Sequence, residues 1–307
     1  MLCIRAHAKI NWTLDIQGTR EDGYHIMDML MQSVSMHDTL YLEEADHLSL
    51  TGEASCQHSD PGTDALSSDV VRYDESNLVF RAAKKLQQQY RVDAGARMHL
   101  IKRIPSGAGM GGGSADAAAA LIGLCRLWKL DVPRDELLAL GLSLGADIPF
   151  MLTGGLARVG GIGEKVSPLM PPKAIWLVLL QPCGGLSTKE VFTAFDSLDP
   201  ATLQRPCTQE AQQALVSRDL PTLGRCMDNV LEGVSIPVRP ALAEAARALE
   251  SCGAIRGMMT GSGSVVYGVF DNQQSAEEAA AALRNISSQK GWGDVWTAST
   301  LEGSGWE

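Results

Sequence analysis

A glycine-rich loop at residues 105–117 has the residue types and spacing of a phosphate-binding site. It reads P-S-G-A-G-M-G-G-G-S-A-D-A, with five glycines between Gly107 and Gly113. The alanine- and leucine-rich run from Ser114 to Leu127 follows, and it predicts a helix whose first turn lies on the glycines. A glycine loop before a helix presents free backbone N–H groups and the positive end of the helix dipole. The segment therefore predicts a loop that holds phosphate.

Two common phosphate-binding motifs fit this loop poorly. Gly107, Gly109 and Gly112 match the G-x-G-x-x-G pattern of dinucleotide-binding folds, and Asp131 lies at about the distance of a ribose-binding acid. Pro105, however, separates the glycines from the preceding strand, and the residues after Asp131 predict the start of another helix. A Walker A loop is excluded because Gly-Lys-Ser and Gly-Lys-Thr do not occur in the sequence.

The loop instead resembles the phosphate loop of the GHMP kinases, which has the form Pro-x-x-x-Gly-Leu/Met-Gly-Ser/Gly-Ser/Gly-Ser. Within that family, the triple glycine is most similar to the branch that phosphorylates a cytidine diphosphate-linked methylerythritol in the non-mevalonate isoprenoid precursor pathway. The resemblance implies an ATP-dependent kinase that acts on the 2-hydroxyl of that alcohol. It also implies that the ATP phosphates lie against Pro105, Gly107, Gly109, Gly111, Gly112, Gly113 and Ser114.

The N-terminal residues predict a β-hairpin. Residues 6–14 read A-H-A-K-I-N-W-T-L, Asp22-Gly23 is a turn signal, and H-I-M-D-M-L-M-Q-S-V predicts the returning strand. On spacing alone, this is an ordinary hairpin with a lysine on its solvent face. Strand alternation places Lys9, Asn11 and Thr13 on one side, and Ala8, Ile10, Trp12 and Leu14 on the other.

Two segments of this hairpin, A-K-I-N and R-E-D-G-Y-H, resemble N-terminal signatures of the same kinase branch. The resemblance implies that Lys9 lies beside the phosphoryl-transfer centre and that Asn11 contacts the substrate. It also implies that Tyr24 stacks on the cytosine ring and that His25 hydrogen-bonds the edge of the base. The residue types suit these roles, because an aromatic ring stacks on a base and an imidazole both donates and accepts hydrogen bonds.

A single aspartate, Asp147, interrupts the apolar segment S-L-G-A-D-I-P-F. An aspartate in such a place is often only a helix cap or a turn residue. The sequence G-A-D-I-P nevertheless resembles the family's Gly-Ala-Asp-Val/Ile-Pro motif, which implies that Asp147 is the catalytic base. Pro149 would fix the backbone beside it, and Lys9 would keep the carboxylate ionised and stabilise the transferring phosphoryl group.

A second glycine turn, T-G-S-G-S at residues 260–264, precedes a predicted core strand. It resembles the third GHMP motif, which implies that Gly261 and Gly263 help to shape the substrate site. Phe192 aligns with an aromatic residue that covers the other face of the cytosine in this branch, although its position is equally consistent with core packing. The segment M-D-N-V-L-E at 227–232 also resembles a family motif, from which it departs at Val230.

Three polar residues outside the loop resemble the family's nucleotide contacts. Asn77 starts a predicted helix near the adenine pocket, and Lys102 ends the strand before the loop. Asp116 would face the adenosine, and we expect its carboxylate to point away from the triphosphate because like charges repel. The resemblance also implies Mg²⁺ on the ATP phosphates, with Ser114 as the one candidate protein ligand.

Composition and charge exclude several other classes of function. The formal net charge is −10 without a cluster of Lys and Arg, which argues against nucleic acid or an anionic membrane surface as a partner. Seven scattered cysteines, with no C-x-x-C and no His at zinc-ligand spacing, indicate reduced thiols. The first strand begins near residue 4, which leaves no room for a signal peptide, and no apolar run could span a membrane. We expect a cytoplasmic enzyme that binds ATP and a small-molecule substrate; the sequence gives no indication of its oligomeric state.

The order of the predicted elements indicates an α+β protein of two domains. The resemblance implies the GHMP kinase fold, with an N-terminal ATP-binding domain of the ribosomal-protein-S5-domain-2-like type over 1–160 and a C-terminal α/β sandwich domain over 161–307. We expect the active site in the cleft between them. The polar segment 53–76 predicts a surface insertion, and Ser275 with Glu278 predicts a capping box. The last strand either stays in the second domain or returns to the first.

Two other functions stay open on the sequence alone. The chain could be a GHMP kinase that acts on a different small alcohol, or a nucleotide-binding module of the same fold without catalysis. Intact Lys9 and Asp147 count against the second function, because a protein without catalysis needs neither.

Overall fold

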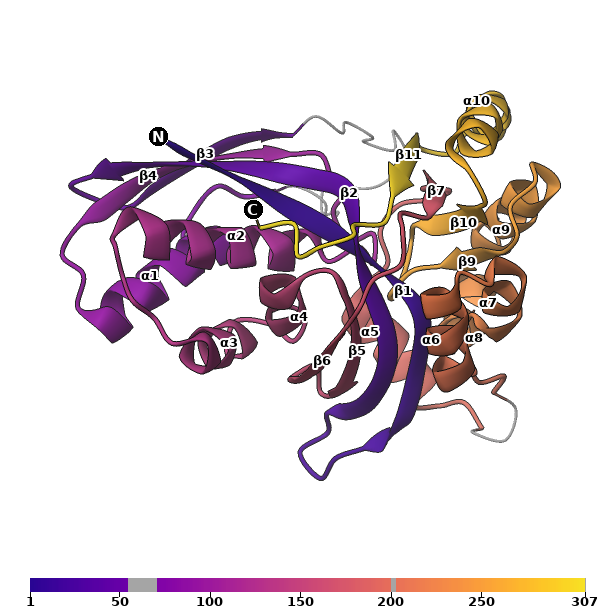
Figure 1. Ribbon diagram of the computed structural model, residues 1–307, viewed down its shortest axis with the longest axis horizontal. Helices are drawn as coiled ribbons and strands as arrows, with labels where there is room; N and C mark the ends of the chain where they lie inside the picture. Colours follow the sequence, from indigo (N-terminus) through magenta and orange to yellow (C-terminus); the bar gives the residue numbers. More distant parts are fainter. Residues whose placement is uncertain (55–70, 200–202, 307) are drawn as a thin grey trace.

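Two β-sheets, each covered by helices, make up the structure (Figure 1). The computed structural model describes residues 1–54, 71–199 and 203–306, so the predicted insertion over 53–76 lies mostly outside the described residues. The first sheet has the strand order β3-β4-β2-β1-β8, with β5 beside β2 and β6 beside β5. The second has the order β11-β7-β10-β9. The predicted α+β class is confirmed.

Helices cover both sheets, as Figure 1 shows. The strands of the first sheet are β1 (Leu2–Thr19), β2 (His25–Ala45), β3 (Ser49–Ala54), β4 (Gly95–Lys102), β5 (Leu156–Gly161), β6 (Lys165–Leu169) and β8 (Asp228–Asn229). Its helices are α1 (Leu78–Tyr90), α2 (Gly112–Leu127), α3 (Arg134–Leu142) and α4 (Ile148–Thr153). The second sheet consists of β7 (Trp176–Leu180), β9 (Gly257–Met259), β10 (Val266–Phe270) and β11 (Val295–Ser299). The remaining helices are α5 (Thr188–Phe195), α6 (Thr208–Ser217), α7 (Leu220–Cys226), α8 (Glu232–Val238), α9 (Ala241–Ser251) and α10 (Gln273–Lys290).

The long hairpin of β1 and β2 is the frame of the first sheet, and its strands were predicted correctly. The assignment of Leu14 to the same side as Ala8, Ile10 and Trp12 is wrong. Those three residues pack in one hydrophobic cluster, whereas Leu14 packs in the other. The pairing of β1 with β2 shifts register between His7 and Lys9 and again between Asn11 and Thr13, and such irregularities move side chains to the opposite face.

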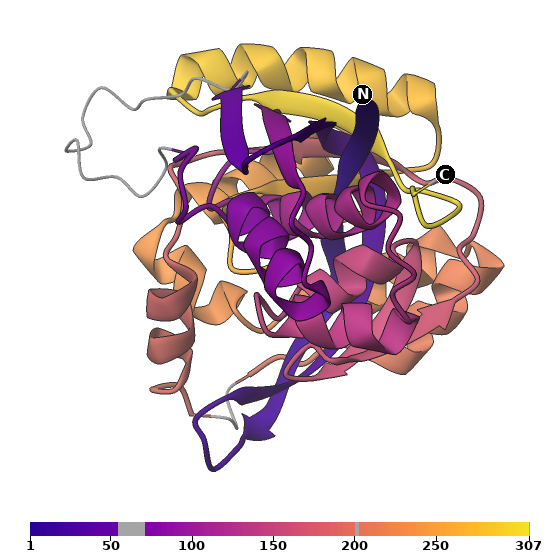
Figure 2. The same ribbon diagram turned by 90° about the vertical axis from the view of Figure 1, so that its left-hand side faces the viewer.

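Helix α2 packs closely on the hairpin because its inward side is built from small residues. Ala115 and the run from Ala117 to Ala120 are fully buried. A β-carbon on Gly123 would lie 2.3 Å from Leu42 Cδ1 on β2, so a larger residue there would require Leu42 to shift. Helices α1 and α2 lie side by side against the sheet (Figure 2). The alanine-rich sequence therefore fixes the position of α2 against the sheet, and with it the end of the glycine loop that begins this helix.

The chain crosses between the two sheets more often than the predicted boundary after residue 160 implies. Strands β6 and β8 follow that boundary but belong to the first sheet, so the division into 1–160 and 161–307 stays a prediction. The last strand, β11, pairs with β7 and thus lies in the second sheet. The residues after it then return: Leu301 N donates to Ser33 O, and Trp306 Nε1 donates to Met151 O at 2.9 Å.

The start of α10 differs from the predicted capping box. Asn272 is the N-cap, and its side chain accepts a hydrogen bond from Ser275 N at 3.0 Å. Glu278 Oε1 instead accepts from Gln274 Nε2 at 2.9 Å. Asparagine is as good an N-cap as serine, so the earlier residue begins the helix.

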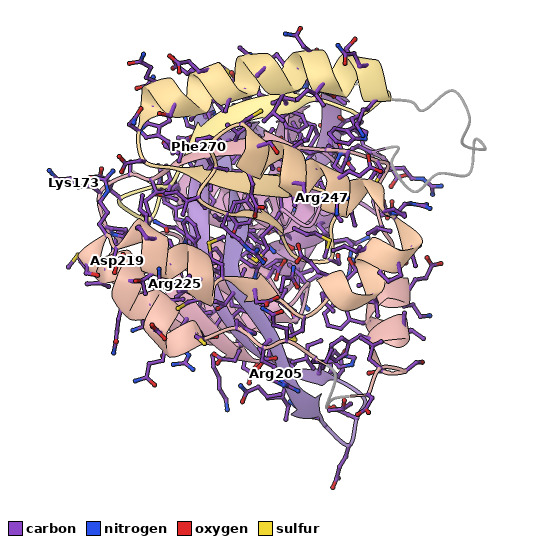
Figure 3. The ribbon with its side chains drawn as sticks, turned by 90° about the vertical axis from the view of Figure 1, so that its right-hand side faces the viewer. Lys173, Arg205, Asp219, Arg225, Arg247 and Phe270 are labelled. Atoms are coloured by element: carbon purple, nitrogen blue, oxygen red, sulfur yellow. The ribbon has the colours of Figure 1, made fainter. Side chains whose placement is uncertain are left out.

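The helices of the second sheet present charges of both signs to solvent. Asp219, Arg225 and Arg247 are exposed on this side, whereas Phe270 is buried in the core (Figure 3). Among the described helices, none combines the length and the apolar character that a membrane crossing requires.

We expect the partly buried His7 to make stability depend on pH. Burial lowers its pKa to about 4, while Nδ1 donates to Val34 O at 3.0 Å. The unfolded chain, in which the pKa is about 6.5, therefore binds more protons than the folded chain between these values, and stability falls as pH drops through this window. Replacing His7 by Gln should reduce the loss of unfolding free energy between pH 7 and pH 4.5 by roughly 1–3 kcal/mol, measured by urea denaturation. Equal losses in both proteins would contradict this.

Candidate active site

A cavity of about 1180 Å³ contains nearly all of the predicted site residues. This volume exceeds that of a usual pocket for one small molecule. Only Asn11 and Gly263, of the residues predicted for the site, do not line it. The predicted residues on its wall are Lys9, Tyr24, His25, Asn77, Lys102, Pro105, Gly107, Gly109, Gly111, Gly112, Gly113, Ser114, Asp116, Asp147, Phe192 and Gly261.

The glycine loop needs its glycines for conformation and for close packing. Gly109 and Gly111 have φ of 74° and 68°, in the left-handed region that side chains disfavour, and Gly111 is the N-cap of α2. A β-carbon on Gly109 would lie 2.0 Å from Thr260 O, and one on Gly261 would lie 2.5 Å from Gly109 O. The two glycine motifs therefore touch backbone to backbone, and the loop of the first sheet rests on a turn of the second.

Lys9 and Asp147 converge on Gly111 at the N-terminus of α2. A β-carbon on Gly111 would lie 3.4 Å from Lys9 Cγ and 3.5 Å from Asp147 Oδ2. Lys9 is 4% exposed, and its Nζ donates to Asn11 Oδ1 at 2.6 Å. Burial lowers the pKa of Lys9, and the Asp147 carboxylate opposes that shift. The Lys9 amino group is thus held beside both the carboxylate and the loop, where an anionic ligand would favour its charged form.

Asp147 is available for chemistry because the helix that positions it does not use its side chain. It precedes α4 as N-cap residue but makes no side-chain capping bond, and Pro149 occupies the first turn. The helix is anchored by its buried residues 148–152 and, at Met151 O, by the bond from Trp306. In the part of the chain that the structure describes, no hydrogen bond or ion pair engages the Asp147 carboxylate.

Three aromatic side chains stand at the hairpin end of the cavity. Tyr24 is 58% exposed, and the His25 and Phe192 rings have their centroids 5.0 Å apart. His25 Nε2 lies 2.6 Å from Asp196 Oδ1, so a carboxylate at the end of α5 holds the imidazole. Phe192 lines the cavity and also packs against the hydrophobic core, and its predicted contact with the cytosine stays a prediction. The exposed Tyr24 ring presents a face on which a flat ring can stack.

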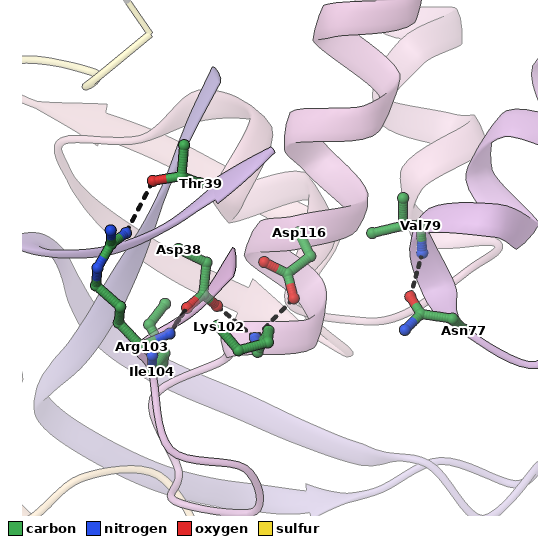
Figure 4. Close-up of polar contacts among 8 residues, drawn as sticks. All are labelled: Asp38, Thr39, Asn77, Val79, Lys102, Arg103, Ile104 and Asp116. Atoms are coloured by element: carbon green, nitrogen blue, oxygen red, sulfur yellow. Dashed lines mark hydrogen bonds and ion pairs between the residues drawn. The ribbon is translucent and has the colours of Figure 1, made fainter. Parts of the chain in front are cut away.

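The predicted nucleotide contacts gather near the start of α1 and α2. Asn77 caps α1 by accepting from Val79 N at 2.9 Å (Figure 4). It also donates to Arg72 O. Lys102 Nζ donates to Asp38 and, at 2.7 Å, to Asp116. Lys102 and Asp116 both line the cavity, but their charged groups face each other. Their contacts with a nucleotide, and the orientation of Asp116 relative to the phosphates, stay predictions.

Asn11 lies behind the cavity wall and not on it. It is fully buried, and its Oδ1 accepts hydrogen bonds from Lys9 Nζ and from Gly261 N, the latter at 3.1 Å. Its backbone carbonyl accepts from Tyr267 Oη at 2.7 Å. Asn11 thus connects the lysine to the second glycine turn, whereas its predicted contact with substrate stays a prediction.

Two supporting residues were given no role in the site by the sequence, although the segment that contains them resembles a family motif. Asn229 Nδ2 donates to Met259 O and Gly261 O, and Glu232 Oε1 accepts from Met259 N at 2.8 Å. Burial raises the pKa of Glu232 to about 7. Both lie in the M-D-N-V-L-E-G-V segment, where polar side chains interrupt an apolar run, and that interruption was the available signal. Residues of the cavity wall that were also missed include Leu14, Met27, Met29, Ile162, Thr188, Leu231 and Ser262.

The oxygen donors near the loop suit a magnesium ion bound mainly by phosphate. Among the described residues, no group of three His, Cys, Asp or Glu side chains could hold a metal by itself. Mg²⁺ commonly takes few protein ligands when phosphates supply the others. Ser114, in the first turn of α2 and on the cavity wall, offers a hydroxyl of the right kind.

Comparison with protein families matches both halves of the chain. The description "GHMP kinases N terminal domain" matches residues 77–155, and "GHMP kinases C terminal" matches residues 211–288.

Relatives of nearly the same length are similar along almost the whole chain. The 4-diphosphocytidyl-2-C-methyl-D-erythritol kinase of Clostridium novyi is 40% identical over 275 residues, which cover 89% of this chain and 92% of the relative. The kinase of the same name from Symbiobacterium thermophilum is 37% identical over 298 residues, which cover 97% and 99%.

Solved structures share the fold. A crystal structure of 4-(cytidine 5'-diphospho)-2C-methyl-D-erythritol kinase matches with a TM-score of 0.79 and 31% identity, over 97% of this chain and 99% of that one. Homoserine kinase from Cytophaga hutchinsonii matches with a TM-score of 0.74 and 18% identity, over 99% and 96%. The two-domain architecture expected from the motifs is confirmed.

Proposed function

The chain belongs to the 4-diphosphocytidyl-2-C-methyl-D-erythritol kinases, a branch of the GHMP kinases, and on that premise we propose that it transfers the γ-phosphoryl group of ATP to the 2-hydroxyl of 4-diphosphocytidyl-2-C-methyl-D-erythritol. The observation that most supports the proposed chemistry is the convergence of Lys9 and Asp147 on Gly111 at the N-terminus of α2. An anion-binding helix start, a buried cation and an unengaged carboxylate are the parts that phosphoryl transfer to an alcohol requires.

In the proposed reaction, Asp147 takes the proton of the attacking hydroxyl group. The hydroxyl oxygen forms a bond to the γ-phosphorus while the bond to the bridging oxygen of ADP breaks. Backbone N–H groups of the loop and the start of α2 hold the phosphates, and Lys9 stabilises the charge of the moving group. Bound Mg²⁺, with Ser114 as its protein ligand, would supply further neutralisation of the phosphate charge. Positioning and electrostatics provide most of the catalysis in such reactions.

The proposed site has two ends, which suits two substrates. His25 pairs with Thr19, at the far end of β1 from Lys9, so the cavity follows the hairpin from the glycine loop to the aromatic group. We propose that ATP occupies the end with Asn77, Lys102 and Asp116, and that the cytosine lies at the end with Tyr24, His25 and Phe192. The acceptor hydroxyl then lies between them, beside Asp147.

The function is tested by measuring ADP release with a panel of alcohols. The panel contains the cytidine diphosphate-linked methylerythritol, its uridine analogue, homoserine, mevalonate and galactose. We expect turnover with the cytidine compound and at most weak turnover with the others. Preference for an alcohol without a base would identify a different GHMP kinase, and ATP binding without turnover of any alcohol would indicate a module without catalysis.

Replacing Tyr24 by Ala should weaken the use of the cytidine substrate and leave the use of ATP unchanged. Stacking of a base on an aromatic ring contributes on the order of 1–3 kcal/mol, so we expect KM for the alcohol to rise by roughly 10- to 100-fold. Steady-state kinetics with each substrate varied in turn measures the effect. Tyr24→Phe is the matched control, because it keeps the ring. A rise in KM for ATP with normal use of the alcohol would contradict the assignment of this end of the cavity.

A further inference from the structure

Asp38 lies beneath the phosphate loop, at a position that neither the sequence motifs nor the proposed reaction uses. It is on β2 and is fully buried, and it does not line the cavity. Its Oδ1 accepts hydrogen bonds from the backbone N–H groups of Arg103 and Ile104, the latter at 2.8 Å. Its Oδ2 accepts from Lys102 Nζ (Figure 4). One carboxylate thus receives three donors, all from consecutive residues.

These bonds connect the two ends of the loop, which we call its stems: the residues that follow β4 and the first residues of α2. Arg103 and Ile104 are the first residues after β4, where the loop begins. Lys102 Nζ also donates to Asp116 Oδ2 at 2.7 Å, and Asp116 lies near the start of α2, where the loop ends. Asp38 therefore holds the first stem directly and the second through the lysine (Figure 4).

The same cluster supports the loop from below at Gly112. A β-carbon on Gly112 would lie 3.0 Å from Ile104 Cγ2 and 3.2 Å from Lys102 Nζ. The side chains of Ile104 and Lys102 therefore pack close to the start of α2, where a phosphate would bind.

Charge in the cluster makes the clamp strong. Burial alone would lower the pKa of Lys102, but the Asp116 and Asp38 carboxylates outweigh it and raise that pKa, so the lysine is a cation at neutral pH. Lys102 and Asp38 are both more than nine-tenths buried, and a buried cation that loses one of its anionic partners is costly. Burial also raises the pKa of Asp116, and the Lys102 ammonium opposes that shift, so the charges of the cluster depend on one another.

We infer that Asp38 is a positioning residue for the phosphate loop: by clamping both stems, it holds residues 103–112 in the conformation that binds the phosphates of a nucleoside triphosphate. This inference rests on the proposed function only in taking the loop as the triphosphate site. Asp38 touches no substrate and acts through the loop alone. Its loss should therefore affect the nucleotide and not the alcohol.

The test is Asp38→Asn, which keeps size but places an amide against the Lys102 ammonium. We expect the Kd of a non-hydrolysable ATP analogue, measured by calorimetry, to rise by about 10- to 100-fold, because hydrogen bonds to charged groups are among the strongest. KM for the alcohol should change less than threefold. Hydrogen–deuterium exchange of peptides covering 103–113 should be faster in the variant, whereas peptides of the second sheet should be unchanged.

The matched control is Asp28→Asn on the same strand. The Asp28 carboxylate accepts hydrogen bonds from Arg158 Nε and Arg158 Nη2, both at 2.8 Å. The control substitution therefore also disrupts an ion pair with two hydrogen bonds, but Asp28 does not line the cavity. Nucleotide binding and exchange at 103–113 should be unchanged in this control.

Unchanged nucleotide affinity in Asp38→Asn, or equal losses for nucleotide and alcohol, would overturn the clamp. If this variant does not fold, the double variant Asp38→Asn/Lys102→Met is compared with the single variant Lys102→Met, because without the lysine no ammonium faces the new amide. Unchanged nucleotide affinity between these two variants, or equal losses for nucleotide and alcohol, would again overturn the clamp. Calorimetry and exchange do not depend on the alcohol. A wild-type protein that binds the ATP analogue but does not phosphorylate the cytidine compound therefore refutes the proposed function and leaves the clamp to be judged by its own measurements.

Discussion

Replacing Asp147 by Asn is expected to lower kcat by roughly 10²- to 10⁴-fold while the affinity for ATP changes little. The amide keeps the size of the side chain but cannot accept the proton of the hydroxyl group. Because the native carboxylate makes no capping bond, the substitution removes no interaction that α4 needs. Single-turnover measurements of phosphoryl transfer at saturating substrates would isolate the chemical step from product release.

The matched control for this variant is Asp135→Asn, which removes a carboxylate from the exposed first turn of α3, the helix that packs against α4. Its kcat should be that of the wild type. Near-normal turnover of Asp147→Asn would show that Asp147 is structural, and the proposed path of the proton would then be wrong.

Replacing Gly109 by Ala is expected to abolish measurable ATP binding. The added β-carbon would lie 2.0 Å from the carbonyl oxygen of Thr260, a backbone atom that cannot swing aside, and φ at this position is 74°. The loop must therefore separate from the second glycine turn or change its conformation. Either change removes the N–H groups from the phosphates, and we expect a loss of affinity of at least about 100-fold in calorimetry.

Gly184→Ala is the matched glycine control, because nothing lies within 4 Å of a β-carbon there. It should bind ATP as the wild type does. The structure also ranks the loop glycines: Gly112 meets only side chains, at 3.0 Å or more, so Gly112→Ala should be milder than Gly109→Ala. Wild-type affinity in Gly109→Ala would mean that the loop does not cradle the phosphates.

The sequence predicted best what depends on local pattern. The helix of residues 112–127 followed from its alanines and leucines, and the hairpin followed from alternation and from Asp22-Gly23. Resemblance to family motifs predicted that Lys9 and Asp147 belong to one site, and both residues line the same cavity. Such motifs carry information about distant pairs that periodicity cannot supply.

The features that the sequence did not predict depend on contacts between segments that are remote in the chain. Asp38 sits in an ordinary-looking strand, and only the sheet brings it to Lys102, so no local signal marked either its burial or its partners. The side of Leu14 depended on register shifts in β1, which the alternation of residue types does not reveal. Spacing alone would place Lys9 on the solvent face of the hairpin, but Lys9 is buried, because the second glycine turn closes over Asn11 beside it.

The contact between Gly109 and the turn at residues 260–263 means that the glycine loop depends on a segment remote from it in the sequence. The stretch that carries it, residues 77–155, contains neither β1 and β2 below the loop nor the turn that walls it. A fragment cut at those bounds would expose the left-handed glycines without the surfaces that select their conformation, and their entropy would favour a disordered loop. Grafting the motif into another scaffold would fail for the same reason. The smallest unit that can hold the glycine loop in this conformation is therefore the pair of packed sheets.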